Sequence, residues 1–263
     1  MELKLGELTL NFTDAENRVN PCVKGFVENF NSGNKMNLEF NKINPARTSL
    51  GTLCEDAVKH LGKLNGQWKC VIKKLVSLGG NVGIHDGGCA LKIIFPSHCG
   101  IVANLIRKNM VFLYYDFLMD NSYRIELDSE EGINRVIMPQ ALHVTTTIFH
   151  ELGHMLGKDK YEACNLSCDH KLSVRISEDA DTNFEAKCAF GDNVSMEGTY
   201  VKKYLQNRYK YHDENNTNEI SSVILELYTF FSLLTFEKSE PSWIKLLRDD
   251  VETKLGKILD CSK

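Results

Sequence analysis

The sequence PQALHVTTTIFHELGHMLG, residues 139–157, decides how the rest of this chain is interpreted. Proline is favoured at the first position of a helix and glycine just beyond its end, so the segment between Pro139 and Gly157 is predicted to form one helix. Apolar side chains recur along it at spacings that can bury one side of a helix: Leu142, Phe149, Leu152 and Leu156. We therefore expect this helix to pack into the core.

The same helix carries the pattern H-E-x-x-H, made of His150, Glu151 and His154. Residues four apart lie on one helical face, so both imidazoles can bind one metal ion, typically zinc. Glu151 lies one step round the helix, where its carboxylate can reach a zinc-bound water and take its proton. The pattern predicts a zinc-dependent hydrolase with Glu151 as general base. The alternative is a chance match whose histidines only fill the core.

A third zinc ligand has to come from elsewhere in the chain. The metzincin pattern H-E-x-x-H-x-x-G-x-x-H needs a histidine where this sequence has Lys160, and Asp159 lies one residue too early to replace it. A second helix is predicted over residues 177–190, and Glu185 is its best-placed carboxylate. Glu185 is the expected third ligand. Glu178 on the same helical face and Asp159 are alternatives, and a metzincin-like protease with a different third ligand also stays open.

Two segments together, HELGH at residues 150–154 and FEAKCAFG at residues 184–191, resemble gluzincin zinc proteases. Over residues 80–211 the chain is similar to short effector proteases that bacteria inject into host cells, and more distantly to clostridial neurotoxin light chains. The resemblance implies a zincin-like α+β fold, with a small mixed or antiparallel sheet, an active-site helix and a mainly helical C-terminal part. It also implies Zn²⁺ held by the two histidines and Glu185, and cleavage of a specific host protein.

Arg208 and Tyr211, in the segment RYKY, resemble the Arg-x-x-Tyr pair of the neurotoxin light chains. The resemblance implies that one or both side chains stabilise the oxyanion that forms when water attacks a peptide carbonyl. Packing and solvation on a surface helix are the alternative roles for both.

The pattern of the remaining chain predicts strands first and helices later, as in an α+β protein. Residues 1–53 are expected to form short strands and loops, and residues 54–78 a helix broken near Asn65-Gly66. Three further strands and three further helices are predicted: Asn81–His85, Ala90–Phe95 and Met110–Leu118, then 196–211, 219–236 and 242–259.

We divide the chain into an N-terminal region of uncertain fold, residues 1–80, and a zincin-like core, residues 81–263. The two can belong to one domain. The N-terminal region, which contains no motif, is predicted to form an exosite together with residues 200–236. Remote binding of this kind would select one protein substrate.

Composition and charge exclude several classes of protein. Hydrophobic residues make up 43% and charged residues 25%, which excludes disorder of the whole chain. A net charge of −4 argues against nucleic acid as the main partner. The most apolar stretch, residues 220–236, contains Glu226 and is shorter than the roughly 20 residues of a membrane span. We expect a monomer that acts on a protein, with no nucleic-acid or membrane partner.

The chain has nine cysteines, scattered and odd in number, which favours reduced thiols over a disulfide framework. Its first residues lack the apolar core of a signal peptide. We expect a cytoplasmic type of protein or, for an effector, delivery into the host cytosol. Cys164, Cys168, His170 and Cys188 form a second cluster with metal-binding chemistry. A structural metal there would favour a binding module, and a catalytically inactive zinc-binding interaction module is the alternative function.

Overall fold

The computed structural model describes nine segments of the chain: residues 1–13, 49–86, 100–105, 108–113, 123–127, 134–161, 172–190, 195–214 and 219–260. The predicted strand over residues 90–95 and the cluster Cys164, Cys168 and His170 lie outside them.

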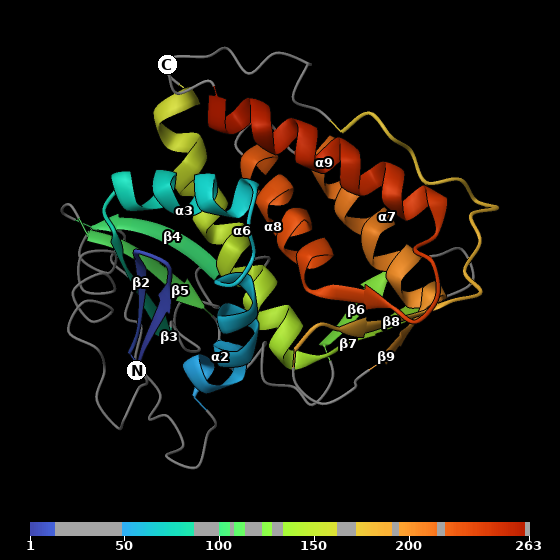
Figure 1. Ribbon diagram of the computed structural model, residues 1–263, viewed down its shortest axis with the longest axis horizontal. Helices are drawn as coiled ribbons and strands as arrows, with labels where there is room; N and C mark the ends of the chain where they lie inside the picture. Colours follow the sequence, from blue (N-terminus) through green and yellow to red (C-terminus); the bar gives the residue numbers. More distant parts are fainter. Residues whose placement is uncertain are drawn as a thin grey trace, which may run out of the picture.

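A five-stranded sheet forms one side of the molecule (Figure 1). Its strands are β1 (Glu2–Leu5), β2 (Leu8–Thr13), β3 (Asn81–Asp86), β4 (Gly100–Leu105) and β5 (Lys108–Leu113), in the order β1-β2-β3-β5-β4. The three central strands are parallel, and β1 and β4 lie antiparallel at the edges. Gly6 has a φ of 60° in the tight turn between β1 and β2, a conformation that glycine adopts at little cost. The predicted strand at residues 81–85 is confirmed, and β5 covers the first part of the one predicted at residues 110–118.

Two helices follow the first hairpin, as predicted for residues 54–78: α2 (Leu50–Leu61) and α3 (Gln67–Ser77). The break between them is confirmed, because Gly66 has a φ of 68° that a regular helix does not contain. On α3, buried Trp68 packs edge-on against Phe149 at a centroid distance of 5.2 Å. Its indole N–H donates to Ser232 Oγ at 2.9 Å. Through β2 and Trp68, the described part of the first 80 residues shares a sheet and a hydrophobic core with the later part of the chain.

The helix predicted between Pro139 and Gly157 is present as α6 (Gln140–Tyr161). Its predicted end was wrong by one turn, because the backbone continues through Gly157, a residue that weakens a helix without breaking it. Every residue from Leu142 to Phe149 is buried. In Figure 1, α6 runs through the middle of the molecule between the five-stranded sheet and the C-terminal helices. A helix in this position has to be covered all round rather than on one side.

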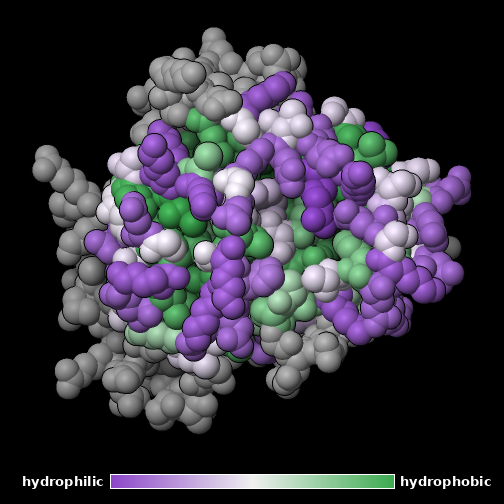
Figure 2. Space-filling model, viewed as in Figure 1, coloured by the Kyte–Doolittle hydropathy of each residue, from purple (hydrophilic) through white to green (hydrophobic). Residues whose placement is uncertain are grey.

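Three C-terminal helices complete the described chain: α7 (Gly198–Glu214), α8 (Ile220–Ser232) and α9 (Ser242–Asp260). All three were predicted, although α8 ends at Ser232 and residues 234–236 form a strand. Residues 220–231 of α8 are all buried, whereas α9 alternates buried and exposed residues. Figure 2 shows the resulting surface, with hydrophilic side chains over most of the described residues and hydrophobic ones visible between them.

The helix predicted over residues 177–190 is absent. Residues 172–184 form neither helix nor strand, and β8 (Glu185–Cys188) pairs antiparallel with β9 (Ser195–Glu197) and with β10 (Leu234–Phe236). Ser177 Oγ accepts from the Asp179 N–H and Asp181 Oδ1 from the Asn183 N–H. Such local side-chain hydrogen bonds compete with helix formation, and pairing with two strands satisfies the β8 backbone.

The described elements therefore form an α+β protein, as predicted. A separate hairpin, β6 (Tyr123–Leu127) and β7 (Asn134–Met138), immediately precedes α6. Among the described residues, no helix combines the length and apolar character that crossing a membrane requires.

Candidate metal centre

The site forms where α8 crosses α6 at Gly153, inside the H-E-x-x-H pattern. A Cβ atom on Gly153 would lie 2.4 Å from Ser222 Cα and 2.8 Å from the Ser221 carbonyl oxygen. Any side chain larger than hydrogen would therefore force the two helices apart. The close approach brings Glu219, which caps the N-terminus of α8, next to His150 and His154 on α6.

Glu219 faces both histidines with the same oxygen. Its Oε2 lies 3.4 Å from His150 Nε2 and 3.5 Å from His154 Nε2. Both distances exceed those of ordinary hydrogen bonds. Ligand atoms bonded to tetrahedral zinc at about 2.0–2.1 Å lie about 3.4 Å from one another, so the spacing fits one ion between these groups. The side chains of His150, His154 and Glu219 are 14%, 24% and 19% exposed, which leaves the position open to solvent.

A second carboxylate of α8 holds the other nitrogen of His150. Glu226 Oε2 lies 2.8 Å from His150 Nδ1, so the ring is flanked by carboxylates on both nitrogens. A charged carboxylate only accepts, which places a proton on Nδ1 and directs Nε2 toward Glu219. Burial opposes a positive charge on His150, but Glu219 and Glu226 outweigh it and raise the pKa of His150 to about 10. The site thus favours positive charge at this point.

Helix α7 supplies two further partners for Glu226. The Tyr204 hydroxyl donates to Glu226 Oε1 at 2.8 Å, and Arg208 Nε lies 2.9 Å from the same oxygen. Burial alone would raise the pKa of Glu226, but the Arg208 charge and then His150 outweigh it and lower the pKa to about 2. Glu226 is therefore a charged, buried group with a hydrogen-bonding partner on each of two other helices.

The charges around the site leave room for a divalent cation. Glu151 is 4% exposed and close enough to raise the pKa of His150. With Glu219 and Glu226 it makes three carboxylates, against the single guanidinium of Arg208. Among these four described groups, two formal negative charges remain when both histidines are neutral, and a divalent ion would neutralise them. The donor set and its charge both fit such an ion.

No protein-family model, curated protein or solved structure matches this chain. The assignment of these residues as a candidate metal centre therefore depends on their geometry.

The predicted third ligand, Glu185, is not part of this group. It lies in β8, is exposed, and pairs with Glu197 of β9. The expectation depended on a helix over residues 177–190, and without that helix Glu185 faces solvent. Glu178 lies exposed in a turn of the same segment, and the side chain of Asp159 is outside the described part.

The structure brings Glu219 to the histidines instead. The available signal was on α8, where Glu219 and Glu226 lie two turns apart on one face of a largely apolar segment. A carboxylate inside an apolar helix needs a partner, which could have pointed to the histidines.

Arg208 lies at the site but faces Glu226, which differs from the oxyanion role that the resemblance implies. Tyr211 lies on α7, and its side chain is outside the described part. Cys188 is half-buried on β8, and burial raises the pKa of its thiol to about 11.

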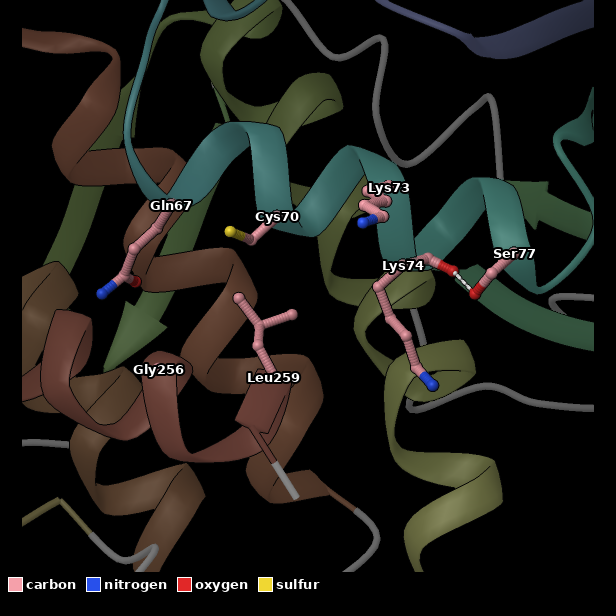
Figure 3. Close-up of a pocket in the computed structure, with 7 residues that line it drawn as sticks. All are labelled: Gln67, Cys70, Lys73, Lys74, Ser77, Gly256 and Leu259. Atoms are coloured by element: carbon pink, nitrogen blue, oxygen red, sulfur yellow. Dashed lines mark hydrogen bonds between the residues drawn. The ribbon is translucent and has the colours of Figure 1, made fainter. Parts of the chain in front are cut away.

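A separate cavity of about 550 Å³ opens between α3 and α9, as Figure 3 shows. The residues around it are Gln67, Cys70, Lys73, Lys74, Ser77, Gly256 and Leu259. Ammonium groups do not bind cations, and Cys70 offers only one thiol. Among the described residues, the donor set for a metal ion is therefore at His150, His154 and Glu219.

Proposed function

We propose that this protein is a zinc-dependent endopeptidase with a zincin-like fold and a gluzincin-type ligand set of His150, His154 and Glu219. The observation that carries the proposal is the placement of Glu219 Oε2 at 3.4 and 3.5 Å from the two Nε2 atoms. The hydrogen bond of Glu226 to His150 Nδ1 supports it, because metal-binding histidines commonly donate their other N–H to a carboxylate.

Each residue of the site has a role in this proposal. Zinc bound there would polarise a peptide carbonyl and make a coordinated water acidic near neutral pH. Glu151, buried beside His150, accepts a proton from the attacking water and passes it to the leaving amine. Glu226 keeps the His150 ring in one orientation and one tautomer.

The substrate in this proposal is a protein, and the specific form is a bacterial effector that cleaves a host protein. The H-E-x-x-H pattern together with a carboxylate third ligand supports a protein substrate. The gluzincin proteases that the sequence resembles share this combination. Selectivity would come from surface remote from the metal, as expected for residues 1–80. Residues 200–236 do not suit that role, because they contain Glu219 and because residues 220–231 are buried.

The proposal is tested by zinc content and by cleavage in one set of variants. The wild-type chain should bind one zinc ion, and Glu219→Ala should lose it while Glu185→Ala keeps it. Glu151→Gln should keep zinc and lower turnover by about 10²–10⁴-fold or more, because general acid–base catalysis is worth that much. Zinc content is measured by elemental analysis, and cleavage by mass spectrometry of new peptide termini in a eukaryotic lysate, with casein in parallel.

The outcomes separate the alternatives. Zinc lost in Glu185→Ala and retained in Glu219→Ala would contradict the ligand set. Zinc bound without any Glu151-dependent cleavage would indicate an inactive zinc-binding module. Digestion of casein and of many lysate proteins alike would contradict selectivity.

A further inference from the structure

We propose that Ser222 is a positioning residue for Glu219, whose carboxylate its hydroxyl holds in the orientation that faces both histidines. The inference rests on the proposed metal site and adds to it a residue that belongs to neither the ligands nor the H-E-x-x-H pattern.

The contacts of the Ser222 hydroxyl carry this inference. Ser222 Oγ lies 3.1 Å from Glu219 Oε2, the same oxygen that faces the two Nε2 atoms, and 2.8 Å from the Glu219 backbone oxygen. The Ser222 residue is fully buried at 0% exposure. Both acceptors of this hydroxyl belong to Glu219, so its hydrogen bonds link the Glu219 carboxylate to the first turn of α8.

Glu219 needs such support because of its position. It lies at the first turn of α8, 19% of its side chain is exposed, and a glutamate has three side-chain torsions to restrict. Without a donor behind the carboxylate, Oε2 would spread over several rotamers and only part of the population would face the histidines. Metal affinity falls when a ligand has to be ordered on binding.

Ser222 is itself held in place by α6. A Cβ atom added to Gly153 would lie 2.4 Å from Ser222 Cα, so the backbones of α6 and α8 are in direct contact here. Gly153 lies between Glu151 and His154, so the helix that carries the two histidines also sets the position of the serine. Ser222 in turn sets the position of the third carboxylate.

The neighbouring serine provides a matched control. Ser221 is also buried, at 1% exposure, and lies one residue earlier on the same helix. Among the described residues its hydroxyl oxygen has no hydrogen-bond partner. Replacing either serine by alanine removes one buried oxygen and introduces the residue with the highest helix propensity, so both variants should fold.

The experiment measures metal binding by the full-length metal-free chain and its variants Ser222→Ala, Ser221→Ala and Glu219→Ala. Zinc affinity is obtained by competition with a chromophoric chelator, and the ligand field from the visible absorption of the cobalt(II) form. We expect Ser222→Ala to weaken zinc binding by about 10–100-fold, the usual effect of losing a group that orients a ligand. Its cobalt spectrum should change, whereas Ser221→Ala should match the wild type in both measurements.

A double variant shows whether Ser222 acts through Glu219. The residual cobalt affinity of the two histidines in Glu219→Ala, titrated at high cobalt concentration, should be the same with and without Ser222→Ala. Equal zinc affinities of Ser222→Ala and Ser221→Ala, in a wild type that binds zinc, would overturn the positioning role and leave the metal site intact. A wild-type chain that binds neither zinc nor cobalt would overturn the proposed function and this inference together.

Discussion

Glu226 joins three helices through one buried carboxylate. From α8 it contacts His150 on α6 at 2.8 Å, and Tyr204 and Arg208 on α7 at 2.8 and 2.9 Å. Its side chain is 4% exposed, and a charge so far from water is tolerated only when its partners satisfy it. Arg208 is therefore important for the stability of the site.

Replacing Arg208 by alanine should lower the free energy of unfolding by about 3–5 kcal/mol, because it leaves a buried carboxylate without its cation. The double variant Arg208→Ala with Glu226→Gln should lose less unfolding free energy than the sum of the two single variants. In the double variant, position 226 no longer carries a buried negative charge that needs a cation. Urea unfolding measures all three. An Arg208→Ala protein of wild-type stability with reduced turnover would instead support the oxyanion role.

At the scale of elements, the crossing of α6 and α8 at Gly153 brings the three candidate metal ligands together. The atoms that a Gly153 side chain would meet are the Cα, N and carbonyl oxygen of the α8 backbone, which cannot move aside as a flexible side chain can. Interhelical separation and the position of Glu219 are therefore coupled.

Gly153→Ala should destabilise the protein by about 1–3 kcal/mol or more through overpacking, and should weaken zinc binding as α8 moves away. Gly256→Ala on α9 is the control, because a Cβ there would meet only Gln67 Nε2, at 3.6 Å. Gly256→Ala removes a glycine from a helix and should stabilise the folded protein by about 0.5–1 kcal/mol. Thermal unfolding and zinc titration compare Gly153→Ala with Gly256→Ala. Equal stability and equal zinc affinity of the two variants would contradict the role of the helix crossing.

At the scale of the whole molecule, the partly exposed ligands lie on two helices that share one hydrophobic core. Trp68 of α3 packs on Phe149 of α6 and on Tyr228 of α8, so the two helices that carry the site are also tied to the N-terminal part of the chain. An ion that bridges α6 and α8 in the folded state alone should therefore stabilise the entire fold.

Saturation with zinc at about 100 times its Kd should add about 2.7 kcal/mol to the stability of the wild type, and removal by a chelator should reverse it. For a protein of this size, Tm should shift by about 2–4 °C for each kcal/mol. Differential scanning calorimetry with and without zinc measures the shift. His154→Ala should show no response, and a wild-type Tm independent of zinc would contradict an ion between the two helices.

Residues 139–157 were enough to predict the central helix and the pair of histidines, because the i, i+4 relation is local and holds wherever a helix forms. The helix break at Gly66 was predictable for the same reason, since a glycine with positive φ acts within its own turn. The strand predicted at residues 81–85 followed from its β-branched residues and the glycine-rich turn after it, although not its parallel pairing. These features depend on neighbours in the sequence.

Contacts between distant segments decided the rest. Residues 177–190 contain acceptable helix formers, yet Glu185–Cys188 became a strand because β9 and β10 offered hydrogen bonds on both sides. That pairing turned Glu185 to solvent. The carboxylate at the histidines became Glu219 because Gly153 lets the α8 backbone touch α6. Which acidic residue meets a histidine pair depends on how closely two helices can pack, and only the tertiary structure determines that distance.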